Sequence, residues 1–82
     1  MNTTVLYSVS EGIATITLNR PHRLNAINPE LLSGFKSALD HANADADVQT
    51  IILCGAGRAF CAGDDLKEFD QQVRNPAETR AY

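Results

Sequence analysis

Clustered positive charge and long hydrophobic runs are both absent from this sequence. Its 82 residues include 7 Lys and Arg against 10 Asp and Glu, which gives a formal net charge of −3. Nucleic acids and anionic membranes are bound mainly by clustered positive charge, so we expect neither of them as a partner. No apolar stretch approaches the ~20 residues that cross a bilayer, and the first residues lack the basic and apolar regions of a secretory signal. We therefore expect a cytoplasmic protein.

Cysteine is also scarce, because Cys54 and Cys61 are the only two in the chain. Without a secretory signal, two free thiols are favoured over a disulfide bridge between them. Together with His22 and His41, the cysteines lack the CxxC or HxxxH spacing that brings zinc ligands together. The sequence predicts no metal site.

The residues that are present fit a folded domain, with 44% hydrophobic and 21% charged content. Residues 5–9 and 13–18 alternate in hydrophobicity with the period of a β-strand. Between them, Ser10, Glu11 and Gly12 form a short turn in which Gly12 can adopt a positive φ, which favours an antiparallel hairpin. Pro21 has no N–H to donate, so residues 19–28 are expected to form a loop.

A helix is predicted from residue 28 to about residue 43. Asn28 can cap the first turn, Pro29 fits the first helical position, and Glu30 lies near the positive end of the helix dipole. Apolar side chains recur at the helical period and predict a core-facing stripe made of Leu31, Leu32, Phe35, Ala38, Leu39 and Ala42. Residues 44–47 are expected to be a linker.

Residues 50–54 are predicted to form a strand that is apolar on both faces. Such a strand is typical of a parallel sheet with helices on both sides, so the order strand, strand, helix, strand indicates an α/β fold with a buried third strand. A short helix is expected at residues 65–69, and Asn75 and Pro76 repeat the start signal seen at residue 28. The sequence ends soon after that signal, which suggests a chain cut short.

The loop after residue 54 is rich in glycine but fits no phosphate-binding motif. Gly55 and Gly57 begin a GxGxxG pattern, yet Phe60 stands at the third glycine position, and no Lys-Ser/Thr pair follows. Asp64, Asp65 and Glu68 could form a base or a cation site. Carboxylates at a helix start are more often caps and partners of the dipole, and we favour that interpretation.

Four segments in order resemble the enoyl-CoA hydratase/isomerase (crotonase) superfamily. They are GIATITLNRP at residues 12–21, LNAI at 24–27, IILCG at 51–55 and RAFCAGDDL at 58–66. The resemblance covers residues 5–69 and the amino-terminal third of family members. It implies a ClpP/crotonase-like ββα spiral, of which residues 1–82 would be a truncated amino-terminal piece: β-hairpin, helix, buried strand, oxyanion loop and short helix.

The resemblance implies an acyl-coenzyme A thioester as substrate and no separate cofactor. Family members stabilise an enolate-like oxyanion at the thioester carbonyl with two backbone N–H groups, and by position the Asp64 N–H is one of them. Gly63 would allow close approach of the substrate, and the Asp64 side chain would be incidental to this role. Oriented amides act strongly on developing charge, and losing one typically costs ~10²- to 10³-fold in rate.

The same resemblance places residues 21–26 and 62–67 around the coenzyme. Arg23 would contact a phosphate, whereas His22 stands where relatives often carry Lys and leaves a second phosphate contact open. The carbonyls of Ala26 and Ala62 would accept from the adenine amino group, and Leu66 would pack against the same end. The implied substrate-binding residues are Arg23, Ala26, Ala62, Gly63, Asp64, Asp65, Leu66 and Lys67.

The family's second oxyanion donor and its acid/base carboxylates lie in segments that this sequence does not contain. The implied function is the acyl-CoA-binding part of an enzyme that most simply hydrates 2-enoyl thioesters, with isomerase, dehalogenase and hydrolase variants also open. The 82 residues alone are expected to be inactive, and the full-length protein to be a trimer or hexamer. The alternative is a non-catalytic module that binds an acyl-CoA or a protein partner.

Overall fold

A β-hairpin opens the fold. In the computed structural model, which describes residues 3–65, strands β1 (Val5–Ser10) and β2 (Ile13–Leu18) pair antiparallel, as the sequence predicts. The turn between them places Glu11 at φ 51° and Gly12 at φ 79°. Two consecutive positive φ values match a type I′ turn, whose twist suits paired strands. The turn therefore sets the register in which Tyr7 lies opposite Ile16.

Helix α1 (Pro29–Ala44) begins at the predicted residue. The Asn28 side chain accepts a hydrogen bond from the Leu31 amide at 2.8 Å, and Pro29 occupies the first turn. The helix ends at Ala44, one residue beyond the predicted end. The predicted core stripe is confirmed, because its members are buried or half-buried: Leu31, Leu32, Phe35, Ala38, Leu39 and Ala42.

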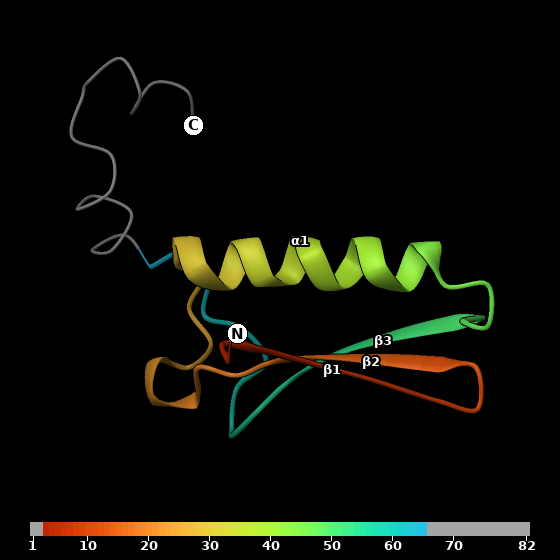
Figure 1. The fold of residues 1–82 in the computed structure, drawn as a ribbon. Coiled ribbons are helices and arrows are strands. Elements are labelled where there is room, and N and C mark those ends of the chain that lie inside the picture. The colour runs from red at the N-terminus through yellow and green to blue at the C-terminus, as the bar shows by residue number, and fades with distance from the viewer. Residues whose placement is uncertain (1–2, 66–82) are drawn as a thin grey trace, which may run out of the picture.

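Strand β3 (Thr50–Gly55) pairs parallel with β2, so the sheet order is β1-β2-β3. The chain crosses from β2 to β3 through α1, which lies over one face of the sheet (Figure 1). This is the α/β arrangement that the sequence predicts. No helix within residues 3–65 is long and apolar enough to cross a membrane.

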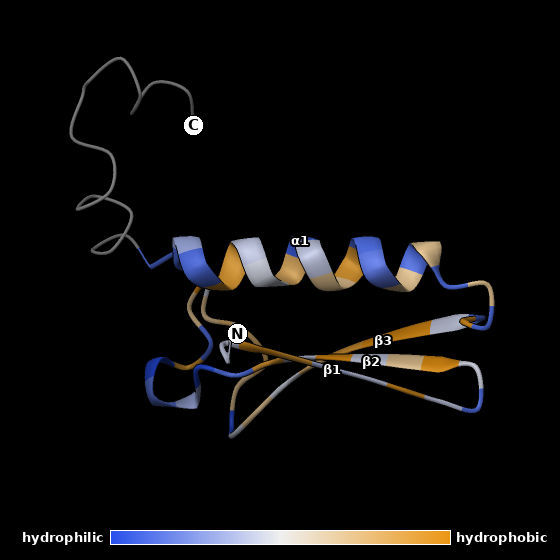
Figure 2. Ribbon diagram, viewed as in Figure 1, coloured by the Kyte–Doolittle hydropathy of each residue, from blue (hydrophilic) through white to orange (hydrophobic). Residues whose placement is uncertain are grey.

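The core lies between α1 and the strands β1 and β2. Its buried side chains are Val5, Ile16, Leu18, Leu31 and Ala38. Figure 2 shows mainly hydrophobic colours along the strands, a white and blue hairpin turn, and a loop of mixed colours after α1. Burial of apolar surface at ~25 cal/mol per Å² is the main force holding these layers together.

The expectation that β3 is a buried strand is wrong for this chain. Ile51, Ile52 and Leu53 are 37%, 45% and 41% exposed. α1 packs mainly on β1 and β2, and β3 is one of the two edge strands of the sheet. Within the described residues no element pairs with its outer edge or covers the sheet face opposite α1. An apolar pattern on both faces shows that a strand is suited to burial on both sides. Among residues 3–65 no layers are present that would bury both faces of β3.

Two loops leave the same end of the sheet, because β2 and β3 are parallel and their carboxyl ends lie together (Figure 1). The first, residues 19–28, contains a short 3-10 turn, η1 (Pro21–Arg23), and is otherwise the predicted loop. The second runs from residue 56 to residue 65. The helices expected at residues 65–69 and from residue 75 lie outside the described residues, apart from Asp65 itself.

Candidate functional site

A parallel β-bridge between Ile27 and Asp64 joins the two loops. The Ile27 amide donates to the Gly63 carbonyl at 2.7 Å, and the Asp65 amide donates to the Ile27 carbonyl at 2.6 Å. The bridge brings residues 21–26 and 62–65 side by side. These are the described parts of the two segments that the sequence assigned to one site.

The bridge leaves the backbone N–H of Asp64 directed away from Ile27. In a parallel bridge of this form the flanking residues, here Gly63 and Asp65, make the hydrogen bonds. Among residues 3–65 no acceptor lies within hydrogen-bond distance of the Asp64 N–H. Asp64 as a residue is exposed.

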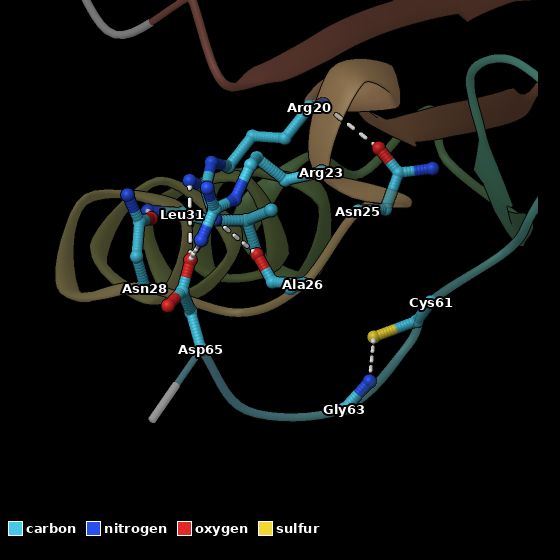
Figure 3. Close-up of polar contacts among 9 residues, drawn as sticks. All are labelled: Arg20, Arg23, Asn25, Ala26, Asn28, Leu31, Cys61, Gly63 and Asp65. Atoms are coloured by element: carbon cyan, nitrogen blue, oxygen red, sulfur yellow. Dashed lines mark hydrogen bonds and ion pairs between the residues drawn. The ribbon is translucent and has the colours of Figure 1, made fainter. Parts of the chain in front are cut away.

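Gly63 has a backbone conformation that favours glycine. Its φ is +94°, and among residues 3–65 no atom outside its chain neighbours would lie within 4 Å of a Cβ at this position. The glycine is therefore required by its φ angle and not by crowding from neighbouring groups. The Gly63 amide itself donates to Cys61 Sγ at 3.4 Å (Figure 3).

Two arginines converge on Asp65 (Figure 3). The Asp65 Oδ2 atom lies 3.4 Å from Arg20 Nη1, 3.5 Å from Arg20 Nη2 and 3.2 Å from Arg23 Nη2. The side chains of Asp65 and Arg20 are 3% and 6% exposed, whereas that of Arg23 is 45% exposed. The helix that Asp65 is expected to cap lies outside the described residues. Sequence reasoning missed the buried ion pair because its partners lie more than 40 residues away.

The Asn25 side chain joins the two loops through hydrogen bonds. Asn25 is fully buried at φ 58°, its Oδ1 accepts from the Arg20 amide at 2.7 Å, and its Nδ2 donates to the carbonyls of Ala56 and Ala59 at 2.9 and 2.7 Å. A Cβ at Gly55 would lie 2.7 Å from the same Nδ2, so glycine is needed for this approach. Asn is a residue type that tolerates positive φ, but nothing in its sequence neighbourhood indicates its partners.

The remaining predicted site residues lie as follows. The Ala26 carbonyl accepts a hydrogen bond from Arg20 Nη1, so one of its two lone pairs is in use. Arg23 is on the rim of the joined loops, with its guanidinium half exposed. Ala62 is exposed beside Gly63. Leu66 and Lys67 lie outside the described residues.

Neither cysteine forms a disulfide, as predicted, and both are partly buried. The Cys54 Sγ lies 3.4 Å from the Thr17 Oγ1 on the uncovered sheet face. Within the described part of the chain no group of three His, Cys, Asp or Glu side chains is placed to hold a metal ion.

Comparison with known proteins gives one consistent result. The family described as Enoyl-CoA hydratase/isomerase matches residues 8–81. A probable enoyl-CoA hydratase of Mycobacterium tuberculosis is 43% identical over 76 residues, which are 93% of this chain and 30% of that protein. A 1,2-epoxyphenylacetyl-CoA isomerase of Escherichia coli is 40% identical over 73 residues, or 89% of this chain and 28% of that protein.

Solved structures agree with the sequence matches. An enoyl-CoA hydratase from Mycobacterium tuberculosis H37Rv superposes with a TM-score of 0.80 at 44% identity, over 85% of this chain and 32% of that one. An enoyl-CoA hydratase from Mycobacterium marinum gives a TM-score of 0.83 at 38% identity, over 90% and 35% of the two chains. The chain thus spans about a third or less of the length of these similar proteins and has the fold of that portion.

Proposed function

The chain belongs to the enoyl-CoA hydratase/isomerase family, and from this premise we propose that it is the thioester-binding portion of an acyl-CoA enzyme. In this proposal the Asp64 N–H donates a hydrogen bond to the thioester carbonyl oxygen and stabilises the negative charge that develops there. Gly63, Asp64 and the residues on either side form one wall of the substrate site.

The observation that carries the proposal is the backbone amide of Asp64. It has no acceptor among residues 3–65, it belongs to an exposed residue, and it lies between the two hydrogen bonds of the Ile27 bridge. A donor held in place before the substrate arrives loses little entropy when charge develops beside it. No described atom outside its chain neighbours lies within 4 Å of a Cβ built at Gly63, and we propose that the thioester lies on this side.

The charge of Arg23, at the rim of the joined loops, supports the part of the proposal that concerns binding of coenzyme A. Arg20 and Arg23 share the single carboxylate of Asp65, so the three side chains together carry a net positive charge. Because the Arg20 side chain is buried and the Arg23 guanidinium is half exposed, the available charge lies at Arg23. A coenzyme phosphate can bind there, and guanidinium is the side-chain group best suited to phosphate geometry.

For the reaction itself, we propose hydration of a 2-enoyl thioester by a longer protein that includes this portion. Similar proteins carry hydratase and isomerase names. None of the described residues is assigned as the acid or base, because Asp65 is committed to its arginines and Asp64 contributes its backbone.

A titration followed by amide NMR tests the proposal on the 82-residue chain. Butyryl-CoA is expected to move the Asp64 amide proton downfield, because a hydrogen bond to the thioester oxygen forms. The matched control is S-butyl-CoA, a thioether with the same alkyl chain and no carbonyl. Equal shifts of the Asp64 amide with both ligands would refute the role of this amide, and no binding of either would refute the proposed function.

A further inference from the structure

We propose that Asp65 is a positioning residue, which holds the Asp64 N–H in its donating orientation through the buried ion pair with Arg20. The inference rests on the proposed function and assigns a role to the side chains of Asp65 and Arg20, which act through their ion pair.

The connection between Asp65 and the amide is short. Asp65 follows Asp64 directly, and its own N–H makes one of the two bridge hydrogen bonds to Ile27. Its side chain is anchored separately, on Arg20 and Arg23. The backbone at Asp64 is thus fixed on its carboxyl side at two points, one on the main chain and one on the side chain, while on its amino side Gly63 has an intrinsically flexible backbone.

Arg20 can serve as an anchor because it is held at both ends. Its backbone amide donates to the Asn25 Oδ1 at 2.7 Å, and its Nη1 donates to the Ala26 carbonyl as well as to Asp65 (Figure 3). The Arg20 guanidinium therefore connects the first loop to the second in a fixed geometry. Because both charges are buried, salt screens this ion pair much less than it would screen an exposed one.

Arg23 has a different position. It reaches the same Oδ2 atom at 3.2 Å from the solvent side, with its side chain 45% exposed. Removing the Asp65 charge would loosen the loop around Asp64 but would leave the Arg23 cation free to bind an anion. The Asp65 carboxylate is thus expected to matter more for the thioester group than for the coenzyme phosphates.

The first test needs no ligand. The variant Asp65→Asn is compared with the unchanged chain by amide hydrogen exchange, with the Ile27 amide as the reporter of the bridge. Exchange at Ile27 is expected to accelerate by at least about tenfold, because removing the Asp65 charge breaks a buried ion pair that joins the two loops and so opens the bridge locally. Sheet amides such as that of Ile16 are expected to change less.

The control variant is Ile16→Val, which lowers stability from the core without touching either loop. If Asp65→Asn accelerates all amides in parallel, as Ile16→Val is expected to do, the carboxylate acts on overall stability alone and the proposal is overturned. Unchanged exchange at Ile27 overturns it as well. If Asp65→Asn does not fold, Arg20→Lys replaces it: a lysine keeps the charge but cannot reach the Ala26 carbonyl and Asp65 together, and the same local acceleration is expected.

The second test separates this inference from the proposed function. The affinity of the chain for butyryl-CoA relative to that for free coenzyme A is expected to fall in Asp65→Asn, because only the thioester uses the Asp64 amide. Equal losses for both ligands would overturn the positioning role. If the unchanged chain binds neither ligand, the proposed function fails, while the exchange result still decides whether Asp65 holds the bridge.

Discussion

Ile27 and Asp64 form a bridge in which Asp64 contributes neither its N–H nor its C=O to Ile27. Replacing Asp64 with proline therefore removes the N–H and leaves both bridge hydrogen bonds in place. Asp64→Ala keeps the N–H and removes only the exposed carboxylate, so it is the matched control for Asp64→Pro. The two variants differ in the backbone N–H and in the φ angle that proline fixes.

The activity of this pair can be measured in a chimaera, in which this chain replaces the matching segment of the Mycobacterium tuberculosis relative that is 43% identical over 76 residues. Hydration of crotonyl-CoA is expected to fall by about 10²- to 10³-fold in kcat/KM for Asp64→Pro relative to Asp64→Ala. Equal activity of the two variants would show that the amide does not stabilise the transition state.

The buried amide of Asn25 is predicted to be the strongest single stabilising contact between the loops. Asn25→Gly keeps the positive φ but leaves the Arg20 amide and the carbonyls of Ala56 and Ala59 without their partner. We expect a loss of at least about 2 kcal/mol in the free energy of unfolding, because buried polar groups left unpaired each cost ~1–3 kcal/mol. Urea denaturation gives this value.

The control is Asn43→Ala, on the exposed side of α1, for which a change within about 0.5 kcal/mol is expected. Asn25→Asp provides a further check, because it keeps the Oδ1 acceptor and replaces the Nδ2 donor with an oxygen facing two carbonyls. Stability close to that of the unchanged chain in Asn25→Asp would contradict the assigned hydrogen bonds.

Asn28 is predicted to stabilise α1 through its cap. Asn28→Ala removes the acceptor of the Leu31 amide and is expected to cost about 1 kcal/mol in unfolding free energy. Asn28→Asp retains the acceptor and serves as the control, with little change expected. A thermal melt followed by circular dichroism distinguishes the two, and an equal loss in both variants would argue against capping as the cause.

The apolar residues of β3 are predicted to drive self-association of the 82-residue chain. Ile52 is 45% exposed on the sheet face opposite α1, on the edge strand. Exposed apolar edges pair readily with other chains, and a lysine on an edge strand opposes such pairing. Ile52→Lys is therefore expected to lower the apparent mass measured by light scattering at high protein concentration.

Ser37→Lys controls for the added charge, because it places the same lysine on the exposed side of α1. Its association is expected to match that of the unchanged chain. Equal suppression by both lysines would mean that net charge, and not the β3 surface, sets the degree of association.

Local signals in the sequence predicted the local elements well. The turn at Gly12, the cap at Asn28 and the helical stripe each depend on residues within a few positions of one another, and all are confirmed. The exposure of β3 could not be predicted this way. Whether Ile52 is covered depends on layers that pack against the strand from elsewhere, and a hydrophobic pattern carries no information on whether they are present.

The candidate site shows the same difference between local signals, which the sequence contains, and long-range contacts, which it does not. The resemblance in residues 58–66 directed attention to the Asp64 amide, and the structure leaves that amide with no acceptor among residues 3–65. The contacts that fix its loop, from Arg20 and Asn25, join residues 31 to 45 positions apart. Such pairs follow from how the loops fold together, and neither composition nor periodicity indicates them.

The parallel pairing of β2 with β3 has a consequence for the order of folding. The β1–β2 hairpin closes across a two-residue turn and can form in ~1–10 μs, whereas β3 pairs with β2 across a much longer stretch of chain that includes α1. During synthesis on the ribosome the hairpin emerges first, and the loops from residues 19–28 and 56–65 meet only once β3 has joined it. The amide of Asp64 is thus oriented by one of the last events in the assembly of this portion.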